Sequence, residues 1–146
     1  MSNRILTNSQ NIADQLHSAA IHLLRKLRKE DEGSGLNAPR LSALSVIVFA
    51  GPVTLGDLAA AEQVRPPTMT RIVNALSEQG LVTRKQDTND RRSTLLSATP
   101  AGKKLLMEGR ARRVRSLAKQ ITGLSHKQRA ALQEAAEILK EVVRAI

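Results

Sequence analysis

The stretch from Thr54 to Thr99 constrains the fold of this chain more than any other part of it. Two short helices are predicted there, because helix-start residues are followed by apolar residues at helical spacing; they span Thr54–Gln63 and Pro66 to a stop at Gly80. Two strands are expected next, Leu81–Gln86 and Thr94–Ala98, around a charged turn. A helix pair followed by a hairpin with a basic tip suits one major groove of DNA and the neighbouring minor groove.

The charge of the chain points to an acidic partner. Its 146 residues, enough for one ordinary domain, include 23 Lys and Arg against 13 Asp and Glu, a net charge of +10. Between Arg65 and Lys119, 13 basic residues stand against four acidic ones. Nearly all of the excess positive charge therefore lies around the predicted helix pair and hairpin, as expected for a protein that binds double-stranded DNA.

Several classes of site and protein are disfavoured by the residues present. The absence of cysteine excludes disulfides, thiolate metal sites and cysteine redox sensing. His17 and His22 lie five positions apart, off the spacing that places two ligands on one helical face, and His126 stands alone, so no metal is expected. Without a phosphate loop, a nucleophile elbow or a paired carboxylate motif, neither an enzyme nor a cofactor is predicted. The longest apolar run, Val46–Ala50, is too short to cross a bilayer, and we expect a cytoplasmic protein.

Further helices are predicted on both sides of the helix pair and hairpin. A helical stripe of apolar residues covers Asn11–Leu27, and a second helix is expected from a cap at Asn37 to Gly51. After the hairpin, one helix should run from Pro100 to about Ile121. A last one should be capped by Ser125.

The final helix carries apolar residues at near-heptad spacing up to the last residue of the chain. These include Leu132, Leu139, Val142 and Ile146. The first and last helices could pack on their own domain, or they could pair with the same helices of a second copy in a two-fold interface. The length of the apolar stripe and the compact helix pair favour a homodimer, which could span two half-sites of one DNA site.

The second helix of the pair offers outward side chains for reading DNA. Met69, Ile72, Val73 and Leu76 are predicted to face inward. The side chains left on the outer face or at the N-terminus are Arg65, Thr68, Thr70, Arg71 and Asn74. Asn pairs well with adenine and Arg with guanine in the major groove.

The turn of the hairpin should place Arg91 and Arg92 at its tip, where Arg can enter a narrow minor groove. Asp90 lies near enough in sequence to brace one of these guanidinium groups with a charge-assisted hydrogen bond.

These linked motifs resemble the MarR family of winged helix-turn-helix regulators. The matching residues are Thr54–Ala59, Pro67–Val73, Leu76, Gly80–Val82, Arg84, Asp87, Asp90–Ser93, Leu96, Thr99 and Gly102. The resemblance implies a mainly α fold with a small β-hairpin wing. It implies a single winged helix-turn-helix domain over residues 1–146, with N- and C-terminal dimerisation segments at about 5–31 and 122–146 and a DNA-reading part at about 53–99.

The same resemblance assigns roles to individual residues. It implies a recognition helix at Pro66–Gln79 and a wing at Leu81–Ala98, with Arg92 as the minor-groove arginine and Asp90 as its orienting partner. Arg65 departs from the small capping residue usual at its position, and we expect it to contact a phosphate instead. The predicted DNA-binding residues are Arg65, Thr68, Thr70, Arg71, Asn74, Arg84, Asp90, Arg91 and Arg92.

The sequence thus predicts a homodimeric, sequence-specific transcriptional regulator, a repressor of pseudo-palindromic operators. The alternative is a non-specific architectural or RNA-associated protein that uses its basic surface alone. Members of the MarR family often lose DNA affinity when a small anionic or phenolic ligand binds, so a small-molecule effector is a further hypothesis. The residues considered for its pocket are Leu16, Ala20, Leu44 and Val48, with His17, His22 or Arg115 nearby.

Overall fold

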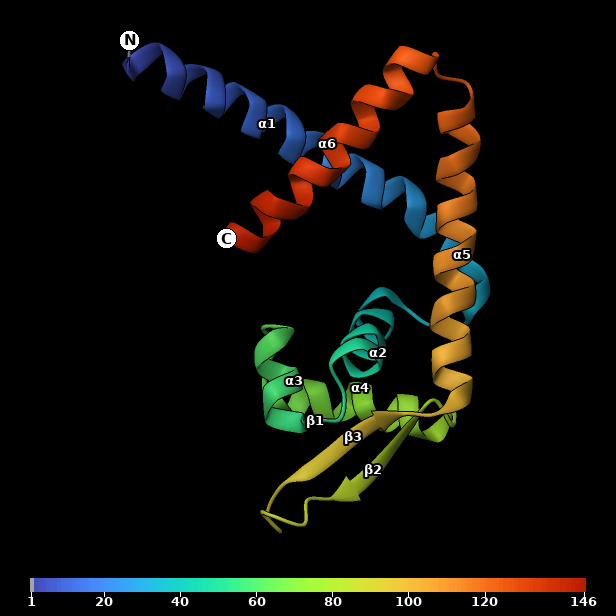
Figure 1. Ribbon diagram of the computed structural model, residues 1–146. Coiled ribbons are helices and arrows are strands. Elements are labelled where there is room, and N and C mark those ends of the chain that lie inside the picture. The colour runs from blue at the N-terminus through green and yellow to red at the C-terminus, as the bar shows by residue number, and fades with distance from the viewer. Residues whose placement is uncertain (1) are drawn as a thin grey trace.

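The computed structural model describes residues 2–146 and the side chains of residues 7–146 (Figure 1). It is mainly helical, with one small sheet. In chain order its elements are α1 (Ser2–Leu27), η1 (Arg28–Ser34), α2 (Ala38–Ala50), β1 (Val53–Thr54), α3 (Leu55–Ala61), α4 (Pro66–Glu78), β2 (Val82–Gln86), β3 (Thr94–Ala98), α5 (Pro100–Thr122) and α6 (His126–Ala145).

The first helix and the segment after it differ from the prediction. Helix α1 starts at Ser2 rather than near Asn11, since the prediction followed the apolar stripe from Ile12 onward and the mainly polar residues before it continue the same helix. The expected polar break at residues 32–35 is largely a 3-10 helix, η1. Gly35, with φ of 73°, ends η1 in a left-handed conformation that glycine adopts without steric cost.

Local capping chemistry fixes the starts of the helices around the sheet. The Asn37 side chain accepts the backbone N–H of Arg40 at 3.1 Å at the start of α2, and Thr54 accepts that of Asp57 at 3.0 Å at the start of α3. Arg65 precedes α4 without a side-chain cap bond, as its departure from the family pattern indicated. The two prolines that follow open α4 where no backbone donor is needed.

The sheet has three antiparallel strands in the order β1-β3-β2. Strand β1 was missed in the sequence because two residues are too few to show an alternating pattern; it pairs Val53 with Leu96. The wing strands β2 and β3 pair in a register that sets Arg84 opposite Leu96 and Gln86 opposite Thr94.

The core lies where α2, α3 and α4 meet the sheet. Its fully buried large side chains are Leu44, Ile47, Leu58, Met69, Val73, Leu76 and Leu96. The inward face predicted for α4 is confirmed, with Ile72 only partly buried. Because its apolar side is anchored in this core, α4 turns its polar side toward solvent.

Helices α5 and α6 were predicted to within a residue or two at each end. Thr99 caps α5 by accepting the backbone N–H of Gly102 at 3.0 Å, and Gly123 follows the last residue of α5. Ser125 and Gln128 exchange side-chain to backbone hydrogen bonds in a full capping box at the start of α6.

Helices α1 and α6 and the far half of α5 extend away from the α2–β3 part of the molecule (Figure 1). None of the α6 residues is buried. Large apolar side chains stay open to solvent on both terminal helices, among them Ile12 at 58% and Val143 at 68% exposure. Within a single chain, the terminal helices do not cover their apolar faces against their own domain.

Candidate nucleic-acid interface

The outward face of α4 carries most of the predicted base-reading residues. Thr68, Arg71 and Asn74 are exposed, and Arg65 is exposed just before the helix. Thr70 differs from the others, because it is partly buried and its hydroxyl donates to the carbonyl oxygen of Pro66 at 2.9 Å. The Thr70 hydroxyl proton is thus used within the helix, as is common for threonine in helices.

Asn74 and Arg84 are brought together by the fold, and sequence reasoning missed this pair. Arg84 lies on β2, and its Nη2 donates a hydrogen bond to Oδ1 of Asn74 on α4. The two residues are ten positions apart and belong to a helix and a strand, so no helical or strand spacing predicts the contact. Helix α4 and the wing are therefore joined by a polar bridge on the exposed surface of the molecule.

The turn of the wing is organised by hydrogen bonds to its backbone. Asp87 N–H donates to the Ser93 carbonyl at 3.0 Å, and Ser93 N–H donates to the Asp90 carbonyl at 2.9 Å. Gln86 Nε2 donates to the carbonyl oxygen of Arg91 at 2.8 Å. These bonds fix the path of the turn and leave the side chains of Arg91 and Arg92 exposed at its tip, as predicted.

Asp90 acts differently from the expectation that it braces a guanidinium group. Its carboxylate accepts the backbone N–H of Arg92 at 3.0 Å, and no ion pair joins it to Arg91 or Arg92 in the part of the chain that the structure describes. A carboxylate commonly accepts a backbone N–H two residues onward in this kind of turn. In the free protein, the Asp90 carboxylate is therefore bonded to the backbone of Arg92, and its role as an orienting partner on DNA stays a prediction.

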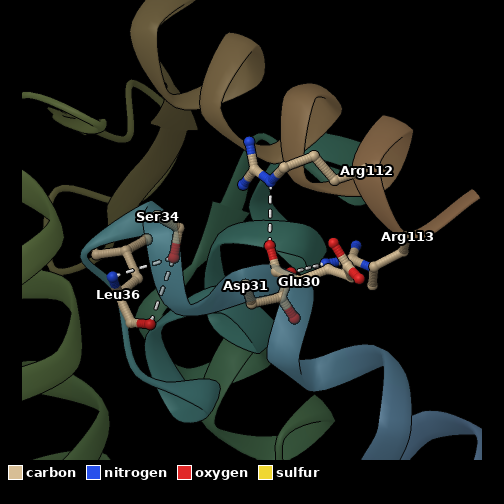
Figure 2. Close-up of polar contacts among 6 residues, drawn as sticks. All are labelled: Glu30, Asp31, Ser34, Leu36, Arg112 and Arg113. Carbon is tan, nitrogen blue, oxygen red and sulfur yellow. Dashed lines mark hydrogen bonds and ion pairs between the residues drawn. The ribbon is translucent and has the colours of Figure 1, made fainter. Parts of the chain in front are cut away.

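A polar junction joins η1 to α5 (Figure 2). Arg112 Nε donates to the carbonyl oxygen of Glu30 at 3.0 Å, and Arg113 forms an ion pair with Asp31. The Asp31 and Arg113 side chains are 16% and 28% exposed, so solvent screens this pair less than a surface pair. Its partners lie 82 residues apart in sequence, and sequence reasoning missed them.

A cavity opens beside this junction, between α1, η1, the start of α2 and α5. It is lined by Leu24, Leu27, Arg28, Asp31, Ala38, Leu41 and Arg113. The residues considered for an effector pocket do not line it. Leu44, for example, is fully buried in the core, and Leu16 lies more than two turns before Leu24 on α1.

Two other features of the described chain bear on the class of protein. No group of three histidine, aspartate or glutamate side chains in residues 2–146 is arranged to hold a metal ion. No helix in this range combines the length and the apolar character needed to cross a membrane.

Comparison with known proteins places this fold and surface in a family. The family model described as MarR family matches residues 36–94. The HTH-type transcriptional regulator Mb0904 of Mycobacterium bovis is 33% identical, over 95% of this chain and 97% of its own length. The chain belongs to the MarR family. It is a DNA-binding transcriptional regulator with a winged helix-turn-helix fold, as its sequence predicted.

Solved structures of similar proteins cover the chain almost completely. The transcriptional regulator Tm0710 of Thermotoga maritima superimposes with a TM-score of 0.81 at 25% identity, over 93% of this chain and 96% of its own. A mutant of S. aureus MepR, bound to an oligodeoxyribonucleotide, superimposes with a TM-score of 0.67 at 19% identity, over 92% of this chain and 98% of its own. At that identity, the MepR comparison supports the fold of this MarR family member and no finer property.

Proposed function

We propose that this MarR family protein is a homodimeric, sequence-specific repressor whose two copies read adjacent half-sites of one pseudo-palindromic operator. The observation that carries the proposal is that two exposed, basic surfaces, on α4 and on the wing, belong to elements joined by the Asn74–Arg84 hydrogen bond. The exposed face of α4 carries Arg71 and Asn74, and the wing next to it carries Arg91 and Arg92 at its tip. A helix of this kind enters a major groove, and Arg side chains suit the adjacent minor groove.

The apolar faces of α1 and α6 support the homodimer. Large aliphatic side chains at positions such as Ile12, Ile138 and Val143 are exposed in the single chain, and an exposed apolar stripe of this length marks an interaction surface. A two-fold pairing of the terminal helices would bury these residues and place two α4 helices on the same side of the assembly. Such a dimer fits half-sites about one helical turn apart.

Of the other predicted residues at the start of α4, Arg65 and Thr68 have roles in positioning the protein on the duplex, whereas Thr70 has a structural role. Arg65 is exposed at the start of α4 and has no capping duty, so its guanidinium is available for a phosphate. Thr68 lies in the first turn of α4, where polar side chains and backbone N–H groups meet phosphates. Thr70, whose hydroxyl proton is used within the helix, contributes packing beside the wing.

The competing function is non-specific binding to DNA or RNA through basic charge alone. A competition titration with a selected duplex and a random duplex at one fixed salt concentration separates the two. The proposed function requires a specificity ratio of about a thousandfold or more. A ratio near one, with affinity that falls steeply as salt rises, would support the alternative and end the proposal.

The proposal also covers how the protein represses and how a small molecule would relieve repression. A dimer that covers an operator keeps other proteins off the same stretch of DNA in the cytoplasm. The junction cavity has an apolar wall from Leu24, Leu27 and Leu41 and two cations, Arg28 and Arg113, which suits a small aromatic carboxylate.

A bound carboxylate would compete with Asp31 for the guanidinium of Arg113 and loosen the link between η1 and α5. Benzoate should then weaken binding of the selected duplex by the wild-type protein, whereas an Arg113→Met variant, which lacks the ion pair, should bind that duplex weakly with or without benzoate. Equal release from both proteins would remove the junction cavity from this role.

A further inference from the structure

The bridge between Asn74 and Arg84 determines which groups Asn74 offers to a base. We infer that Arg84 is a positioning residue that holds the Asn74 amide with its nitrogen toward the duplex, so that Asn74 reads hydrogen-bond acceptors and does not select adenine. This inference rests on the proposed function, because it specifies how the recognition helix of a sequence-specific regulator reads one position of each half-site.

The fold gives Arg84 its place at the foot of the wing. Val82, Arg84 and Gln86 share one face of β2, since side chains alternate along a strand, and Val82 on that face is buried in the core. The partner of Arg84 on β3 is the buried Leu96. The Cβ of Arg84 therefore lies on the face of the hairpin that packs against the helices. Its guanidinium group reaches Asn74 on the exposed side of α4.

The neighbours of Arg84 are consistent with a side chain that points toward Asn74. Arg84 lines a small cavity between the start of α3, α4 and the wing, together with Leu55, Thr70, Thr94 and Leu96. The Thr70 hydroxyl donates back to Pro66 and does not compete for the guanidinium. The stem of Arg84 lines the wing side of this cavity, the residue as a whole stays exposed, and Asn74 is the polar group that its Nη2 contacts.

The chemistry of the two groups fixes the direction of the amide. A guanidinium only donates hydrogen bonds, so the Asn74 atom facing it must be the carbonyl oxygen Oδ1. Pairing of asparagine with adenine needs Oδ1 and Nδ2 to face the base edge together, one accepting from N6 and one donating to N7. With Oδ1 turned to Arg84, the Nδ2 donors are the groups that face DNA. Guanine offers them the acceptors N7 and O6 and thymine offers O4, whereas the N7 acceptor of adenine lies beside the N6 donor, which an amide nitrogen cannot satisfy.

The experiment compares the base preferences of four proteins by selection of bound duplexes from a random pool. They are the wild type, Asn74→Ala, Arg84→Met and the control Lys85→Met. Methionine keeps an unbranched apolar stem of similar reach and removes the donors. Lys85 is a matched control because it is an exposed cation next in sequence on β2, on the opposite face of the strand.

The position read by Asn74 is the one at which Asn74→Ala loses its preference. The wild type should prefer guanine or thymine there, and Arg84→Met should gain adenine over guanine by about tenfold, because a freed amide can form the paired contact. Lys85→Met should bind more weakly at every duplex sequence and keep the wild-type motif.

Three results would overturn the inference. One is an Arg84→Met motif identical to that of the wild type, which would make Arg84 a phosphate contact. Another is that Asn74→Ala keeps every base preference of the wild type. The third is a wild type that already prefers adenine at that position. A wild type that selects no motif at all would instead refute the proposed function, and the inference with it.

A measurement on the free protein tests the bridge without DNA. The side-chain amide resonances of Asn74 should shift in Arg84→Met and remain in place in Lys85→Met. Unchanged resonances in Arg84→Met would show that the bridge does not form in solution.

Discussion

Two glycines of α5, Gly102 and Gly109, should respond in opposite ways to the same substitution by alanine. A Cβ at Gly102 would overlap the carbonyl oxygen of Leu81 and lie 3.1 Å from its carbon and 3.3 Å from Cδ1 of Leu44. That carbonyl cannot easily move, because it accepts the backbone N–H of Thr99 at 3.0 Å. A Cβ at Gly109 would lie 3.6 Å from the nearest atoms, which belong to the Arg112, Arg113 and Asp31 side chains.

The magnitudes follow from these distances. Gly109→Ala makes only ordinary van der Waals contacts and gains helix propensity, so it should raise the free energy of unfolding by about 0.5–1 kcal/mol. Gly102→Ala must displace α5 from the start of β2, and overpacking of this kind should lower the free energy of unfolding by about 1–3 kcal/mol. The pair of variants should therefore differ by about 1.5–4 kcal/mol at a matched protein concentration.

Urea unfolding followed by far-UV circular dichroism is the assay, with both variants at the same protein concentration because dimerisation contributes to stability. The midpoint should rise for Gly109→Ala and fall for Gly102→Ala. A midpoint for Gly102→Ala that does not fall would show that close contact with Leu81 is not what requires glycine at position 102, and a fall for Gly109→Ala would refute the reasoning for position 109.

Four further predictions concern DNA binding, the ion pair between Asp31 and Arg113, and assembly. Arg92→Ala should weaken binding of the preferred duplex by at least about tenfold, close to 1.4 kcal/mol, while sedimentation shows an intact dimer; unchanged affinity at moderate salt would contradict the role of the wing. Arg71→Ala should relax preference at one base pair by about 1–3 kcal/mol in competition titrations, whereas a uniform loss would mark a phosphate contact. A double-mutant cycle of Asp31→Asn and Arg113→Met in urea unfolding should give a coupling energy of about 1–2 kcal/mol, since the pair is partly shielded from water, and zero coupling would remove the ion pair as a structural link. Val143→Glu should convert dimer to folded monomer in sedimentation experiments, and a persistent dimer would place the interface elsewhere.

Features that depend on neighbouring residues could be predicted from the sequence. The caps at Asn37, Thr99 and Ser125 were identified correctly, because a cap acts on a backbone N–H two or three positions away. The buried face of α4 followed from the spacing of its apolar residues. The family was recognised because these local signals occur in one order over most of the chain.

Features that depend on distant parts of the chain could not be predicted. The ion pair between Asp31 and Arg113 joins segments that only the fold brings together. The bridge between Asn74 and Arg84 depends on the angle between a helix and a strand, and it changes the expected preference of Asn74 for adenine. The hydrogen bond of Asp90 shows a further limit of prediction from sequence. A nearby arginine offers a carboxylate both a guanidinium group and a backbone N–H, and sequence spacing does not tell which of the two it binds.

The central claim is that two copies of the chain read one duplex together. Hydroxyl-radical footprinting of the wild-type protein on its selected duplex tests it most directly. We predict two protected regions of equal strength, related by two-fold symmetry and separated by about one helical turn on the same face of the DNA. A single protected region, or two that lack the symmetry, would contradict the claim.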